Sequence, residues 1–305
     1  MKSNLYILSK SALLRPIRLK GLLRFEFLII CFLLALCSRV SAQTSTQTST
    51  QTSAPSQHKS SATVSLEDLT WPELVEKIKD GFTTVIVPTG GTEQGGPHMA
   101  LGKHNFIVQH SALRIAVDVK RVLVTPLIPF VPEGEFDKPS GNFLYPGTIN
   151  ISEDTFAKTL IDVCTSLNSS GFKLIVLMAD HGQSMPIQEL VAQNLTQAWK
   201  PMGVRVVNLS AYYDARLEAA VLKRAGIAQG DWGDHAGVAD TSELWFVRPQ
   251  ALRISQLKTD KVQGYQDAGA SGKPELSSAE LGREMMDLRV KAGVQQLNTF
   301  IKDVN

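Results

Sequence analysis

Histidines occur in three short segments of this chain that also carry carboxylates. The segments cover residues 89–104 (TGGTEQGGPHMALGKH), 179–183 (ADHGQ) and 233–242 (GDHAGVADTS). Imidazole and carboxylate groups brought together from separate loops form the kind of site that binds a divalent metal ion. A lone histidine after a strand is more often a hydrogen-bonded structural residue, and paired glycines are often simple turns. The residue types alone therefore leave a metal site and a structural role both open.

Several familiar catalytic and cofactor motifs do not occur in the sequence. It has no zinc-finger spacing, no HExxH pair, no nucleophile elbow and no Walker loop. The glycine-rich segment over residues 90–96 does not follow the GxGxxG pattern, which argues against a dinucleotide site. A metal-assisted reaction is the chemistry that the three segments still allow.

Short apolar runs alternate with helical patterns along most of the chain. Runs typical of strands cover residues 83–87, 122–126, 173–178 and 204–209. Patterns typical of helices cover residues 105–119, 154–167, 184–199 and 279–303, with Ser152 as a cap of the second. Continuous β-branched runs between helices predict a three-layer α/β/α sandwich with a largely parallel central sheet. The three segments are then expected in or beside loops at the carboxyl ends of strands, where such sheets bind ligands.

The loop over residues 130–146 is long and carries proline, glycine and aromatic residues. Long loops in compact domains commonly have a function. We expect this loop to act as a lid or as an oligomer contact, and its Phe136 and Tyr145, with Trp232, either to line a pocket or to pack in the core.

Composition and charge limit the class of protein. The chain has 305 residues, of which 20% are charged and 43% hydrophobic, and this composition excludes a wholly disordered, collagen-like or disulfide-rich protein. Residues 1–42 hold seven basic residues and one acid, which leaves 24 basic and 28 acidic residues in 43–305, a net charge of −4. Nothing in this balance points to a nucleic-acid partner.

Residues 1–42 have the pattern of an export signal. Basic residues precede an apolar run over residues 27–37, and small residues follow just before Gln43. The run is too short to span a bilayer comfortably, which takes about 20 residues. We expect a periplasmic or secreted protein, with membrane attachment only if the leader stays uncleaved. Residues 43–62 are rich in Gln, Ser and Thr and predict a flexible tether, so the folded domain is expected over 63–305.

Two of the three cysteines, Cys31 and Cys37, lie in this leader. The mature chain would keep Cys164 alone, which excludes an internal disulfide. Because Cys164 lies in an apolar helical pattern, we expect it to pack in the core rather than to act as a nucleophile.

Four ordered segments between about residues 71 and 247 resemble motifs of the creatininase family of metal-dependent amidohydrolases. The first is the Gly-x-x-Glu-Gln-His-Gly-Pro-His loop, which matches here at Glu93, Gln94, Gly96, Pro97, His98, Leu101 and Gly102. The others are the Pro-Gly-Thr segment at 146–148, the strand-end segment at 179–181 and the His-Ala-Gly segment at 235–242. The resemblance implies a creatininase-like α/β sandwich, a metal-dependent hydrolase and a homo-oligomer, commonly a hexamer.

The resemblance also implies two metal ions, but this chain departs from the pattern. The first metal corresponds to Glu93, His104 and His181, where His104 stands in place of a bridging aspartate. The second corresponds to Gly95, His104 and Gln183, and all three positions are changed. Gly95 has no ligand atom, Gln183 is a weak ligand, and one imidazole does not bridge two cations as a carboxylate does. We therefore expect one divalent ion per protomer, Zn²⁺, Fe²⁺ or Mn²⁺, bound by the first set.

The resemblance assigns catalysis to the third segment. His235 corresponds to the histidine that polarises the substrate or shuttles a proton, and Asp240 to an acid that is glutamate in the family. Because Gln183 cannot be a base, His235 or Asp240 must take a proton from the attacking water.

Five further residues are candidates for supporting roles. His98 is expected to be structural or to line the pocket, and Lys103 either to hold an anionic substrate group or to be exposed. Asp180 and Asp234 are expected either to orient His181 and His235 or to be surface acids, and Gln183 to donate a hydrogen bond.

The leading hypothesis is an exported, single-metal hydrolase of a C–N bond in a small amide, lactam or short peptide. A metal-dependent isomerase, lyase or iron-dependent oxidase would use the same ligands. A non-catalytic binding protein on the same fold is the third possibility. Creatinine itself is disfavoured as a substrate, because the two-metal centre is altered.

Overall fold

The computed structural model describes residues 63–257 and 269–303, which all belong to one compact unit, residues 58–305. The export signal expected over 1–42 and the tether expected over 43–62 lie outside the described residues. Within the described part, every helix is too short or too polar to cross a membrane.

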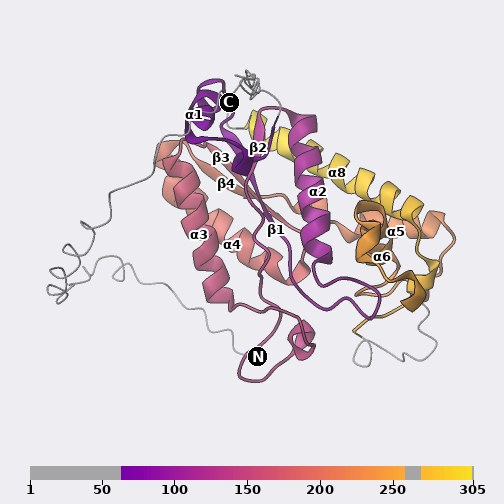
Figure 1. The fold of residues 1–305 in the computed structure, drawn as a ribbon. Coiled ribbons are helices and arrows are strands. Elements are labelled where there is room, and N and C mark those ends of the chain that lie inside the picture. Colours follow the sequence, from indigo (N-terminus) through magenta and orange to yellow (C-terminus); the bar gives the residue numbers. More distant parts are fainter. Residues whose placement is uncertain (1–62, 258–268, 304–305) are drawn as a thin grey trace, which may run out of the picture. The chain divides into compact units, whose positions relative to one another are not determined.

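Four parallel strands form the central sheet, in the order β2-β1-β3-β4 (Figure 1). They are β1 (Thr84–Thr89), β2 (Val122–Val124), β3 (Leu174–Ala179) and β4 (Arg205–Asn208). Every residue of β1, β2 and β3 is buried, as expected for strands covered on both faces. All four predicted strands are confirmed.

The first strand continues through Pro88 to Thr89, beyond the predicted end at Val87. Proline cannot donate a ladder hydrogen bond, so its place in a strand needs an explanation. The neighbouring β2 has already ended at Val124, and the Pro88 carbonyl accepts instead from the Ile128 N–H at 3.1 Å. Pro88 therefore costs no strand-to-strand hydrogen bond on that side.

Helices cover both faces of the sheet, which confirms the three-layer sandwich (Figure 1). One face packs against α2 (Lys103–Val119) and α8 (Ala279–Lys302), around Ile86 and Met178. The opposite face, with Val85, packs against α1 (Trp71–Lys79), α3 (Glu153–Ser169) and α4 (Met185–Trp199). Successive residues of β1 therefore pack into two separate hydrophobic cores, one on each face of the sheet.

The predicted helices are confirmed with small changes at their ends. The Ser152 hydroxyl accepts a hydrogen bond from the Thr155 N–H at 3.2 Å, so the predicted cap of α3 is correct. Cys164 of α3 is fully buried, as expected, and burial raises the pKa of its thiol to about 12.

Among the described residues, three α-helices were not predicted: α1, α5 (Ala215–Arg224) and α6 (Val238–Val247). The expectation of a strand-end loop over 233–242 is wrong from residue 238 onward, because that part forms the first half of α6. Five of its ten residues are buried, and it packs against α8 and α2. A helix covered on several sides lacks the one-sided apolar stripe by which helices are recognised.

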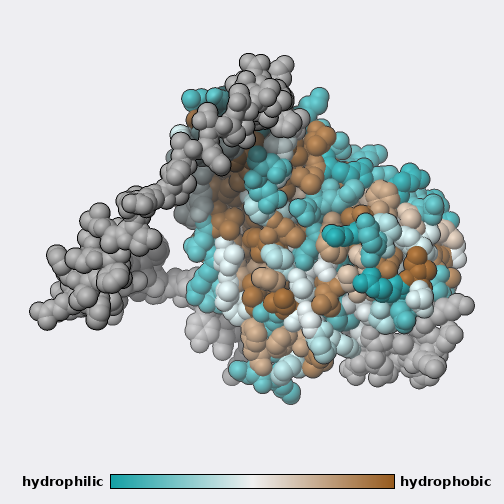
Figure 2. All heavy atoms as spheres, viewed as in Figure 1, coloured by the Kyte–Doolittle hydropathy of each residue, from teal (hydrophilic) through white to brown (hydrophobic). Residues whose placement is uncertain are grey.

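The face seen in Figure 2 carries apolar side chains scattered among polar ones. In the loop over residues 130–146, Phe136 is 52% and Leu144 is 59% exposed. The expectation that this loop serves as an oligomer contact stays a prediction.

Candidate metal centre

The predicted ligands lie at the carboxyl edge of the sheet, in the loops after β1 and β3 and at the start of α2. Glu93 follows β1, His104 is the second residue of α2, and His181 follows β3. The loop after β1 passes very close to α2: a Cβ on Gly90 would lie 2.9 Å from the Asn105 Cα. Glycine at this position, together with the Gly91 N–H bond to Asn105 Oδ1 at 3.1 Å, holds the loop against the helix.

The structure brings Glu93, His104 and His181 together, with one ligand atom of each within 4.8 Å of the others. Glu93 Oε1 lies 2.8 Å from His104 Nε2, and Glu93 Oε2 lies 3.3 Å from His181 Nε2. All three residues are buried. Two imidazole nitrogens facing one carboxylate fit a single Zn²⁺, Fe²⁺ or Mn²⁺ ion, so the expected ligand set is geometrically sound.

The protonation of these groups is coupled to metal binding. Burial raises the pKa of Glu93, but Lys103 and the two histidines outweigh it and hold this pKa well below its usual value. Burial lowers the pKa of His181, but its hydrogen bonds to Glu133 and Glu93 raise it to about 9. A metal ion that binds at neutral pH therefore has to displace a proton from His181.

Lys103 is neither exposed nor placed to meet a substrate anion directly. Its side chain is fully buried, with Nζ at 3.3 Å from Glu93 Oε1 and 3.0 Å from Asp240 Oδ2. Burial lowers its pKa, but Asp240 and Glu93 raise it above the usual value, so the ammonium stays charged. A second metal ion on this side of Glu93 would have to compete with a fixed positive charge, which favours a single metal ion.

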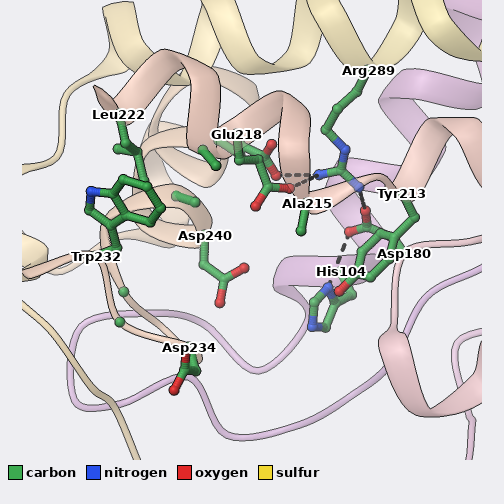
Figure 3. A pocket seen from close by; sticks show the side chains of 15 residues that line it. His104, Asp180, Tyr213, Ala215, Glu218, Leu222, Trp232, Asp234, Asp240 and Arg289 are labelled. Carbon is green, nitrogen blue, oxygen red and sulfur yellow. Dashed lines mark hydrogen bonds and ion pairs between the residues drawn. The ribbon is translucent and has the colours of Figure 1, made fainter. Parts of the chain in front are cut away.

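Asp180 contacts His104, the ligand at the start of α2 (Figure 3). Its Oδ2 lies 3.1 Å from His104 Nδ1, while its Oδ1 accepts from Tyr212 and Arg289. The hydrogen bond that Asp180 accepts from Nδ1–H leaves the His104 Nε2 lone pair free to face a metal ion. Asp180 is thus a buried partner of His104, whereas the sequence predicts it either beside His181 or at the surface.

Arg289 reaches this site from α8 and was not predicted (Figure 3). Its guanidinium pairs with Asp180 and Glu243, and it lies 3.8 Å from Glu218. Its neighbours Met285, Met286 and Val290 are buried. A single arginine on the apolar face of a helix was the signal in the sequence.

His235 lies beside Glu93, whereas Asp240 lies on the far side of Lys103, and the two residues differ in protonation. His235 Nδ1 is 3.8 Å from Glu93 Oε1, and its Nε2 is 3.0 Å from the Gln94 carbonyl oxygen. Burial and the positive charge of Lys103 lower the pKa of His235 to about 4, so the ring is neutral at pH 7. Burial raises the pKa of Asp240, but Lys103, the largest of the opposing charges, holds it below the usual value. A neutral His235 can accept a proton, whereas Asp240 is committed to Lys103 and to the Ala236 N–H at 2.7 Å.

The remaining candidates lie away from the three ligands. His98 is fully buried, with Nε2 at 3.0 Å from Thr241 Oγ1, and therefore ties the first loop to α6. Gln183 and Asp234 are exposed. Asp234 lines a cavity, and its backbone N–H donates to Ser271 Oγ at 2.8 Å.

Replacing His98 by glutamine is expected to weaken the acid sensitivity of the fold. Burial lowers the pKa of His98 from 6.5 to about 4, so between these values the unfolded chain binds a proton that the folded chain does not. Stability from this residue is therefore lost as pH falls, by about 2 kcal/mol between pH 7 and pH 5. Urea unfolding at both pH values should show a smaller loss in H98Q than in the unmodified protein. Equal losses would contradict a neutral, buried His98.

A cavity of about 320 Å³ adjoins the site beside His104 and Asp240 (Figure 3). Its wall includes Trp232, one of the three aromatic residues expected to line a pocket. Phe136 instead packs edge-to-face on Phe143, with ring centroids 5.3 Å apart. The volume suits a small molecule.

A parallel α/β sandwich with buried histidines and a carboxylate at the carboxyl edge of its sheet has the build of an α/β metalloenzyme. Residues 67–297 match the family model described as Creatininase: Creatinine amidohydrolase. The chain therefore belongs to the creatininase family, and it is a creatininase-like, metal-dependent hydrolase, as the sequence motifs implied.

Individual relatives agree with this assignment. A creatinine amidohydrolase of Pseudomonas putida is 27% identical over 204 residues, which cover 65% of this chain and 76% of that protein. A 3-dehydro-scyllo-inosose hydrolase of Thermotoga maritima is 25% identical over 124 residues, 41% of this chain and 38% of that protein. A crystal structure of creatinine amidohydrolase shares the fold, with a TM-score of 0.64 and 21% identity over 77% of this chain and 97% of that one.

Proposed function

We propose that this protein hydrolyses a C–N bond in a small amide, lactam or short peptide, using one divalent metal ion held by Glu93, His104 and His181. The observation that carries the proposal is the convergence of these three buried ligand atoms within 4.8 Å. The two relatives named above are both hydrolases by name, one of them an amidohydrolase, which supports hydrolysis over the isomerase, lyase and oxidase alternatives.

A divalent ion in this site would polarise the substrate carbonyl and lower the pKa of water to about 7. As the water oxygen bonds to the carbonyl carbon, the neutral His235 ring accepts the water proton at Nδ1, and it passes this proton to the leaving nitrogen as the C–N bond breaks. Asp180 keeps His104 in the required tautomer, and Asp240 keeps the Lys103 ammonium in place. Asp180 and Asp240 are positioning residues.

A single metal ion is the stoichiometry that the chain supports. Gly95 offers no ligand atom, Gln183 is exposed, and the Lys103 ammonium lies 3.3 Å from Glu93 Oε1. Zinc, iron and manganese all suit two imidazoles and a carboxylate. One solved structure that shares the fold, named "Creatininase Mn", has a TM-score of 0.65 at 20% identity.

We also propose that the protein is exported and forms a homo-oligomer. The pattern of residues 1–42 supports export to the periplasm or the medium. The exposed apolar side chains of the loop over residues 130–146 support a homo-oligomer, with a hexamer as the first state to look for.

Metal content and turnover, measured together, test the function. The purified protein is expected to hold about one equivalent of metal and to release amine from at least one compound in a panel of amides, lactams and dipeptides. Chelation should abolish the release, and Zn²⁺, Mn²⁺ or anaerobic Fe²⁺ should restore it. A fully loaded protein without hydrolysis would favour the isomerase, lyase or oxidase alternatives. A protein that takes up no metal would favour a non-catalytic binding role.

A further inference from the structure

We propose that Glu133 is a fourth ligand of this metal ion, supplied by the loop over residues 130–146. The inference rests on the metal site of the proposed function and adds a residue to it. Glu133 lies between β2 and α3, far from the three segments in sequence, and its side chain is fully buried.

The nitrogen of His181 that would bind a metal lies between two carboxylates. His181 Nε2 is 3.0 Å from Glu133 Oε2 and 3.3 Å from Glu93 Oε2. One imidazole nitrogen carries at most one proton, so it cannot make a full hydrogen bond to both acids at once. A divalent cation in the same space can bind the nitrogen and both carboxylates together.

Asn142 holds the two carboxylates side by side. Its Nδ2 donates to Glu93 Oε2 and, at 3.2 Å, to Glu133 Oε2. Two buried carboxylates that share one donor repel each other unless a cation lies close by. Lys103 contacts the other oxygen of Glu93, Oε1, so without a metal ion the His181 ring between the two carboxylates supplies this charge. A metal ion bound to His181 takes over that place and contacts both carboxylates.

The second oxygen of Glu133 has no role in holding the loop. Oε1 is buried and lacks a hydrogen-bond partner among the described residues, an arrangement that costs free energy. The loop is fixed by its backbone instead: the Glu133 N–H donates to Asn150 Oδ1 at 2.8 Å. Gly91 leaves room for the carboxylate, since a Cβ there would lie 3.0 Å from Glu133 Oε1.

Charge balance favours the same ligand set. Lys103 and Asp240 form an ion pair beside the site and cancel each other. A divalent ion with Glu93 alone would then leave one uncompensated positive charge in a buried place. A second carboxylate makes the centre neutral, which lowers the cost of burying the cation.

Zinc affinity of the full-length protein, stripped of metal and titrated against a competing chelator, tests the proposal. Glu133→Gln keeps the shape of the side chain and removes its charge, and Glu135→Gln makes the same change at an exposed site in the same loop. We expect the dissociation constant for Zn²⁺ to rise about 100-fold in E133Q and to stay within about twofold in E135Q. The rise in Tm on zinc loading should shrink in E133Q alone.

A purely structural role for Glu133 gives a different result. If Glu133 serves only as the ion-pair partner of His181, E133Q loses the same stability with and without zinc and binds zinc as the unmodified protein does. That outcome would overturn the proposal. Should E133Q fail to fold, Glu133→Asp retains the charge and moves the carboxylate back by one methylene. The visible spectrum of its Co²⁺ form should then change, and an unchanged spectrum would also overturn the proposal.

These measurements need no turnover, so they separate this inference from the proposed function. Zinc binding that depends on Glu133, in a protein that hydrolyses none of the panel, supports the ligand and contradicts the hydrolase. Hydrolysis by the unmodified protein, together with unchanged zinc affinity in E133Q, supports the hydrolase and contradicts Glu133 as a ligand.

Discussion

The substitution Glu93→Gln is expected to abolish metal binding at this site. Glu93 contacts both histidine ligands and the Lys103 ammonium, and all of these groups are buried. In E93Q the neutral amide is a weak ligand, and the positive charge of Lys103 loses one of its two carboxylate partners and repels an incoming cation. Changes in residues that merely orient a ligand weaken metal binding 10–100-fold, so loss of this ligand should weaken it more than about 100-fold. Elemental analysis after gel filtration should show a fall from about one equivalent to a trace.

A matched change at the surface controls for this experiment. Glu189→Gln alters an exposed residue of α4 and should leave metal content and hydrolysis unchanged. Circular dichroism and Tm show whether E93Q keeps its fold. A folded E93Q that retains one equivalent of metal with near-normal affinity would mean that the metal binds elsewhere, and the proposed site would be wrong.

The sheet, and the meeting of the segments that carry the expected ligands, could be inferred from the sequence because both depend on local patterns. The β-branched runs mark β1 and β3 by themselves, and parallel strands bring the residues that follow them to one edge. Glu93 and His181 are therefore neighbours by topology alone. The family resemblance then singled out these two residues and His104, which ends the glycine-rich segment, as the ligands.

The residues that the sequence did not reveal depend on distant partners. Lys103 is buried because Asp240, 137 residues later, lies 3.0 Å from its ammonium. Glu133 resembles its exposed neighbour Glu135 in every local respect, and only the fold brings it to His181. In the same way, Arg289 is one of several arginines and lysines in α8, and only the fold brings it to Asp180.

These distant partners form a continuous chain of charge behind the ligands. From Glu93, contacts run through His104 to Asp180 and on to Arg289 and Glu243. A ligand held by such a chain has little freedom to rotate, which favours a preformed metal site. The same arrangement makes the fold depend on the Arg289 guanidinium, which pairs with Asp180 and Glu243.

Replacing Arg289 by methionine is expected to cause a large loss of stability. The guanidinium is 2% exposed and pairs with Asp180 and Glu243, whose side chains are 1% and 2% exposed. Methionine fills a similar volume but leaves these acids buried without their cation. Breaking a buried ion pair by removing one partner costs about 3–5 kcal/mol, and urea unfolding measures this loss.

The same helix supplies the control. Arg283 is 62% exposed and lies 4.0 Å from Asp287, so Arg283→Met should change the free energy of unfolding by less than about 0.5 kcal/mol. Adding Asp180→Asn and Glu243→Gln to R289M should recover part of the loss, because it removes two buried acids that lack a partner. Most of the recovery should come from Asp180, since burial raises the pKa of Glu243 well above its usual value. If R289M is no less stable than R283M, the acids do not depend on Arg289. If the triple variant recovers nothing, the loss comes from packing, because the guanidinium also stacks 4.3 Å above the Tyr212 ring.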